Sequence, residues 1–86
     1  MLNLVQNQSN TCWTFAEMWG GTAPFTLELI NNIDRDAKQS FVLSLSDYGD
    51  RKSYTITPTQ ITGTYDYTIK DDAGNVFEIG LAEITE

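Results

Sequence analysis

Apolar and polar residues alternate with a period of two along most of this chain, which is the spacing of side chains on a β-strand rather than on a helix. In the stretch PFTLELI, for example, Phe25, Leu27 and Leu29 alternate with Thr26 and Glu28. A strand with this pattern buries one face and leaves the other in water. The alternation therefore predicts an all-β protein.

Four further segments repeat the alternation, and turn-forming residues such as those of NNIDRDAKQ and DDAGN stand between them. Pro58 cannot donate a hydrogen bond to a sheet, so we expect the strand in KSYTITPT to end near it. The apolar residues expected to point inward in these four segments are Phe41, Leu43, Leu45, Tyr54, Ile56, Ile61, Tyr65, Tyr67, Ile69, Phe77, Ile79 and Leu81.

The alternation slips near the end of VFEIGLAEI, because Glu83 falls on the apolar phase and Ile84 on the polar phase. We therefore expect a β-bulge or the end of the strand near Ala82. In TCWTFAEMW the spacing of Trp13 and Phe15 indicates a strand, whereas the residues that follow favour a helix. A helix this short would be marginal, so we expect a strand here.

With the short LNLV segment, these stretches give about seven strands, separated by turn signals about every 8 to 12 residues. This spacing predicts a small antiparallel, immunoglobulin-like β-sandwich that forms one domain over residues 1–86. In such sandwiches a tyrosine near the start of the penultimate strand bonds back to the backbone, and Tyr65 is a candidate for that role. An ordinary buried tyrosine would explain Tyr65 equally well.

The formal charge of −7 would repel the phosphates of a nucleic acid, so we expect no nucleic-acid partner. No apolar run approaches the roughly 20 residues that span a bilayer, and MLNLVQNQSN does not have the pattern of a signal peptide. We therefore expect no membrane association and synthesis in a cytoplasm.

The chain has one cysteine, Cys12, and no histidine. A Cys-His or Ser-His nucleophile is therefore impossible, and an unpaired cysteine usually behaves as a small buried apolar residue. We expect no enzymatic activity, no catalytic residue and no cofactor.

Acidic residues gather in three predicted turns, as Asp34 with Asp36, Asp47 with Asp50, and Asp71 with Asp72. Carboxylates on loops suit calcium, but none of these groups has the spacing of an EF-hand loop. Turn formation explains the aspartates more simply, and we expect no metal site.

The aromatic residues divide into two groups. Alternation places Trp13, Phe15, Phe25, Phe41 and Phe77 in the core. Trp19 follows no inward phase, and Tyr48 lies in a predicted loop. For both tryptophans, a surface that contacts a partner is the alternative to burial in the core. The residues we expect to bind a partner are Trp19, Tyr48, Arg35, Arg51 and Lys52.

The run from FTLELINNIDRDAKQSFVLSLSD through YGDRKSYTITPTQITGTYDYTIKDDAGNVFEIGLAEI resembles small virion-associated proteins of tailed phages of Bacteroidetes-type bacteria, including crAss-like phages. The likeness covers about residues 12–84 and consists of an Asn-rich turn after a strand, an SDYGDRKSYTI-like segment, a Gly-x-Tyr-x-Tyr strand and an EIGLAEI-like strand. The segment CWTFAEMWGG departs from the pattern.

The resemblance implies an auxiliary or decorating structural protein of the capsid, neck or tail, with no catalytic residues. Its partners would be other virion structural proteins and also further copies of itself. It would be located in the virion after synthesis in the cytoplasm of the bacterial host. A free-standing module that binds a carbohydrate or a host protein is the alternative.

Overall fold

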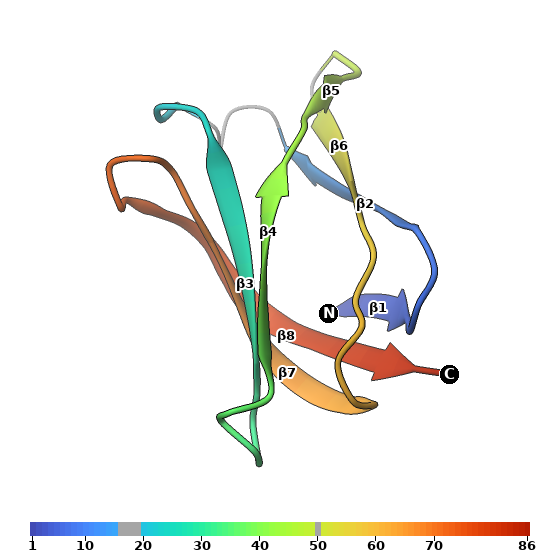
Figure 1. Ribbon diagram of the computed structural model, residues 1–86. Coiled ribbons are helices and arrows are strands. Elements are labelled where there is room, and N and C mark those ends of the chain that lie inside the picture. The colour runs from blue at the N-terminus through green and yellow to red at the C-terminus, as the bar shows by residue number, and fades with distance from the viewer. Residues whose placement is uncertain (16–19, 50) are drawn as a thin grey trace.

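The computed structural model (Figure 1) describes residues 1–15, 20–49 and 51–86. These residues form strands and turns, and no helix is present in this part of the chain. The strands are β1 (Leu2–Val5), β2 (Asn10–Phe15), β3 (Phe25–Asn31), β4 (Lys38–Leu43), β5 (Ser46–Asp47), β6 (Arg51–Ile56), β7 (Gly63–Lys70) and β8 (Val76–Thr85).

The strands make two sheets, a large one in the order β1-β8-β7-β3-β4 and a small one in the order β2-β6-β5. All pairs are antiparallel except β1 with β8, which run parallel. If the strands are lettered A, B, C, C′, D, E, F and G in chain order, the sheets read A-G-F-C-C′ and B-E-D. Strands C, F and G share one sheet and B, E and D the other, as in an immunoglobulin-like sandwich, so the predicted fold is confirmed. The two-residue strand β5 is the one that alternation did not indicate.

The core lies between the sheets, and most of the expected inward residues fill it. Leu27 and Leu29 of β3 and Tyr65 and Ile69 of β7 are fully enclosed. Phe41 and Leu45 are half-buried and pack against this core. The other expected inward residues that are buried are Phe25, Leu43, Tyr54, Ile56 and Tyr67.

The predicted facing of β8 is wrong. Ile79 is 71% exposed and Leu81 is 45% exposed, whereas Ala82 and Ile84 are buried. The register shows the reason, because Ile69 pairs with Glu78 but Lys70 pairs with Val76, which leaves one extra residue in β8. The bulge therefore lies at position 77, not near Ala82, and it reverses the phase of the strand that follows.

The sizes of the cross-strand partners explain which face of β8 turns inward. Tyr67 lies opposite Gly80, and Tyr65 lies opposite Ala82. A Cβ atom added at Gly80 would come within 2.9 Å of the Tyr67 ring. Two large tyrosines on β7 thus require the smallest residues of β8 beside them, and the larger Ile79 and Leu81 face outward.

The segment before β7 also departs from expectation, because Ile61 is exposed rather than inward. Its backbone carbonyl accepts a hydrogen bond from the Tyr65 hydroxyl at 2.6 Å. This is the backbone bond expected of the tyrosine near the start of the penultimate strand in immunoglobulin-like sandwiches. Tyr65 stands near the start of strand F, as that role requires.

The strand ends follow their turn-forming residues. β6 ends at Ile56, two residues before the buried Pro58, as predicted. Between β7 and β8, Gly74 has a φ of 89°, which glycine adopts without strain. The Asn75 backbone N–H donates to the Asp71 carboxylate at 2.8 Å and closes the turn.

Candidate functional site

Trp13 lies on the outer face of the small sheet, with 45% of its surface exposed. Its neighbours on β2, Cys12 and Thr14, are buried between the sheets. Because successive residues of a strand face opposite sides, a buried Cys12 requires an outward Trp13. The prediction that Trp13 belongs to the core is therefore wrong, whereas the burial expected for Cys12 is confirmed.

Two side chains from the β5–β6 hairpin converge on Trp13. The Tyr48 ring meets the indole edge to face, with ring centroids 5.2 Å apart and planes at 64°. The Arg51 guanidinium carbon lies 4.6 Å from the centroid of the indole ring, which is cation–π geometry. We call Trp13, Tyr48 and Arg51 the Trp13 cluster.

The backbone of the hairpin positions the cluster. The Tyr48 N–H donates to the Arg51 carbonyl at 2.8 Å, and Gly49 between them has a φ of 73° that permits the tight turn. Trp13 pairs across the sheet with Ser53, whose small side chain leaves room for the indole to reach toward β5. The three side chains are thus held together before any partner arrives.

Lys52 stands beside the cluster but faces a different neighbour. It pairs across β5 and β6 with Asp47, and its ammonium group forms an ion pair with the Asp47 carboxylate. Because Asp47 is largely exposed, this pair contributes little to stability. Its effect is to offset the charge of Lys52 at the edge of the site.

Of the five residues expected to bind a partner, the structure brings together two, Tyr48 and Arg51. Lys52 follows Arg51 on β6 and pairs with the inward-facing Thr14, so it faces the other side of the small sheet. Arg35 lies elsewhere, in the β3–β4 loop, and forms an ion pair with Asp66 at 2.7 Å on the large sheet. Trp19 lies outside the described residues, as does the side chain of Phe15.

Trp13 itself was missed as a contact residue. The signal that identifies it is the adjacent Cys12, since a lone cysteine is among the most often buried residue types. Two adjacent residues of one strand cannot both enter the same core, so the cysteine places Trp13 outside.

A second group of polar side chains lies between the sheets, around the Glu78 carboxylate. Tyr67 donates a hydrogen bond to one Glu78 oxygen at 2.6 Å, and Thr14 donates to the other at 2.9 Å. Tyr54 and Cys12 are buried beside them. These contacts connect β2 in one sheet with β7 and β8 in the other.

Three of these inner side chains, Cys12, Tyr54 and Tyr67, have raised pKa values. Burial raises the pKa of the Cys12 thiol above its ordinary value. Burial also raises the pKa of Tyr54, and burial followed by the bond to Glu78 raises the pKa of Tyr67. The thiol and the phenols are thus favoured in their protonated forms, and the hydrogen bonds of Tyr67 and Thr14 to Glu78 connect the two sheets.

Backbone donors bond to the aspartates of two of the three acidic turns, and Asp50 of the third turn lies outside the described residues. Both oxygens of Asp71 accept hydrogen bonds, from the backbone of Asn75 at 2.8 Å and from the backbone of Thr22 at 3.2 Å. Asp34 accepts from the backbone N–H of Asp36 at 3.2 Å. Within residues 1–15, 20–49 and 51–86, no group of three or more cysteine or acidic side chains could hold a metal ion.

Comparison with protein-family models, curated proteins and solved structures finds no match to this chain. In the part of the chain that the structure describes, no helix is long and apolar enough to cross a membrane.

Proposed function

We propose that this chain is a non-enzymatic binding module that docks on a folded protein through the Trp13 cluster. The observation that carries the proposal is the convergence of Trp13, Tyr48 and Arg51 on one exposed surface. Tryptophan, tyrosine and arginine are the residue types most enriched where protein interfaces gain their binding energy. Because the three side chains already contact one another, less entropy is lost on binding.

The geometry favours a protein over a carbohydrate as the partner. A sugar that stacks on tryptophan needs an open face of the indole, and here the Arg51 guanidinium lies over that ring. A guanidinium stacked in this way keeps its N–H edge free to donate to a partner carbonyl or carboxylate. The surface therefore combines apolar area with directed donors, which suits a protein partner.

The resemblance of residues 12–84 to small virion-associated phage proteins supplies the setting of this proposal. In that setting the chain is an auxiliary or decorating protein of a tailed-phage capsid, neck or tail, and its partner is another virion structural protein. The acidic surface, with a formal charge of −7, supports solubility before assembly.

Quantitative mass spectrometry of gradient-purified particles tests this role. We expect the wild-type chain in many copies per particle, and we expect Trp13→Ala to reduce incorporation by more than about tenfold, the change expected when an interface anchor is removed. Ile33→Ala is the matched control, because Ile33 is 91% exposed and lies in the β3–β4 loop, away from the cluster. Circular dichroism of both variants verifies the fold.

The contrary outcomes separate the two classes of function. If the chain is abundant in infected-cell lysate and absent from mature particles, the structural role is overturned and a soluble binding protein is favoured. If the purified chain binds a glycan and Trp13→Ala abolishes that binding, the partner is a carbohydrate and the preference for protein is wrong.

A further inference from the structure

The outer face of the large sheet, meaning the side chains of β1, β3, β4, β7 and β8 that point away from the small sheet, carries a second apolar surface. Val42, Val76, Ile79 and Leu81 all lie on this face and are exposed. They account for four of the nine exposed large apolar side chains among the described residues. The Trp13 cluster lies on the other sheet, so the two surfaces are separate.

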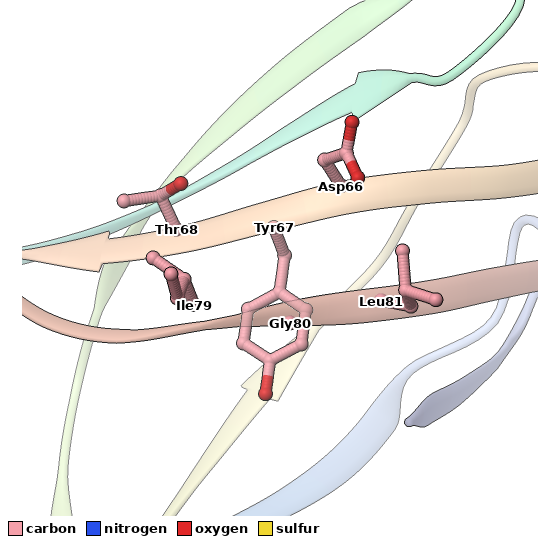
Figure 2. Close-up of a pocket in the computed structure, with 6 residues that line it drawn as sticks. All are labelled: Asp66, Tyr67, Thr68, Ile79, Gly80 and Leu81. Carbon is pink, nitrogen blue, oxygen red and sulfur yellow. The ribbon is translucent and has the colours of Figure 1, made fainter.

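A shallow depression lies in this face between β7 and β8 (Figure 2). Asp66 and Thr68 border it from β7, and Ile79 and Leu81 border it from β8. Its floor is the backbone at Tyr67 and Gly80, since the Tyr67 ring lies on the inner side of the sheet. A protruding apolar side chain of a partner would fit between Ile79 and Leu81.

The charges of this face differ from those of the rest of the chain. Three cations lie on this face: strand pairing places Lys38 and Lys70 there, and the ion pair with Asp66 places Arg35 there. Strand pairing also places three carboxylates on it, those of Glu28, Asp66 and Glu83. The charged strand residues of this face and Arg35 therefore balance, and the formal charge of −7 belongs to the other residues, which include Asp34 and Asp36 of the β3–β4 loop.

This distribution favours a second copy over a strongly charged partner. Two molecules that each carry −7 repel when their other surfaces approach, but not when two faces with balanced charges of both signs meet. A strongly basic or strongly acidic partner would instead select a face of the opposite sign. A contact between identical faces forms a closed pair with two-fold symmetry.

The size of the face is sufficient for such a pair. Five strands spaced about 4.8 Å apart give a width of about 24 Å, and eight residues of β7 give a length of about 26 Å. Each copy thus offers about 600 Å², and a pair would cover about 1,200 Å², which exceeds the roughly 1,000 Å² expected of a specific interface.

We propose that the chain forms a face-to-face homodimer through the outer face of its large sheet, with Ile79 and Leu81 at the centre. Sedimentation equilibrium of the purified full chain over a dilution series tests this. The wild type is expected to show a reversible monomer–dimer equilibrium, and Ile79→Asp is expected to raise the dissociation constant by at least about tenfold, because the carboxylate would be buried in the contact.

Two variants make the result specific. Ile33→Asp adds the same charge at an exposed isoleucine outside the face and is expected to leave the dissociation constant unchanged. Trp13→Ala is expected to leave it unchanged as well, so failure of the dimer and failure of the proposed docking function are distinguishable. Since Ile79 is largely exposed in the monomer, Ile79→Asp should retain the wild-type circular dichroism spectrum.

The proposal is overturned if the wild type remains monomeric at concentrations up to about 1 mM. It is also overturned if the dimer survives Ile79→Asp, or if Trp13→Ala abolishes it and thereby assigns the contact to the small sheet.

Discussion

The Tyr65 hydroxyl donates a hydrogen bond to the backbone carbonyl of Ile61 at 2.6 Å. The aromatic ring of Tyr65 is fully enclosed in the core, whereas the Ile61 side chain is exposed. The bond therefore anchors a surface segment to the centre of the sandwich and fixes where β7 begins.

Replacing this tyrosine by phenylalanine removes the bond and keeps the ring. We expect Tyr65→Phe to lower the free energy of unfolding by about 1 kcal/mol, the net contribution of a typical hydrogen bond. Urea denaturation measures the change, and Tyr48→Phe on the exposed face is the control. A loss no larger than that of the control would show that the bond does not stabilise the fold.

Truncating Tyr67 removes a large part of the contact between the sheets. We expect Tyr67→Ala to destabilise the purified domain by about 3–5 kcal/mol, because packing and transfer free energy are both lost. Tyr67→Phe keeps the ring and loses only the hydrogen bond to Glu78, so its cost should be about 1–2 kcal/mol. A loss below about 1 kcal/mol for the alanine variant would place Tyr67 outside the core.

A methyl group at position 80 has no room beside the Tyr67 ring, which lies 2.9 Å from the position its Cβ would occupy. We expect Gly80→Ala to cost about 1–3 kcal/mol, as overpacking does elsewhere in protein cores. Gly20→Ala is the matched control, because no atom lies within 4 Å of a Cβ added there. Equal melting temperatures for the two variants would contradict the close packing described for β7 and β8.

The Asp71 carboxylate links stability to acid pH. Burial acts to raise its pKa, but the hydrogen bonds from Asn75, Thr22 and Ala73 outweigh burial, and the pKa is lowered below its ordinary value of 3.8. A lowered pKa in the folded state stabilises the fold above pH 3.8, and this contribution disappears as the pH falls through the folded-state pKa. Asp71→Asn should therefore be less stable than the wild type at neutral pH, and the difference should shrink in acid.

Denaturation curves from neutral pH to below the ordinary pKa of Asp71 measure this trend. The neighbouring Asp72→Asn serves as the control, because Asp72 is exposed and its backbone, not its carboxylate, bonds to Thr22. A gap between wild type and Asp71→Asn that stays constant over the whole range would refute the role of the charged carboxylate.

The same turn predicts the response to calcium. Because backbone donors already occupy the Asp71 oxygens, adding calcium or a chelator should leave the melting temperature unchanged. A calcium-dependent rise that Asp71→Asn removes would instead identify a metal site at this turn.

The two-residue period was sufficient to predict the sandwich, since β3, β6 and β7 bury the residues that alternation selects. It was not sufficient for β8, where the residues that must face inward are Gly80 and Ala82. An alternation pattern is recognised by its large apolar residues, so it predicted that Ile79 and Leu81 face inward. Tyr65 and Tyr67 of β7 limit the size of the side chains that β8 can place beside them. The residue pattern of β8 alone gives no information about these neighbours.

The candidate site shows the same limit. Tyr48 and Arg51 could be selected from the sequence because they lie in a predicted loop. Alternation predicted Trp13 in the core, although a lone cysteine such as the adjacent Cys12 is also expected to be buried. The burial of Cys12 in the structure shows which of the two faces inward, and it depends on the pairing of β2 with β6, which joins residues some 40 positions apart.

The parallel pairing of β1 with β8 limits the order in which the large sheet can form. Among the strands of this sheet β1 is made before the others and β8 after them, yet Leu2 pairs with Ala82 and Leu4 with Ile84. Until β8 emerges, Leu4 has no neighbour in the large sheet and its apolar surface stays in water. The docking of β1 is therefore expected to be a late, long-range step in the folding of this domain.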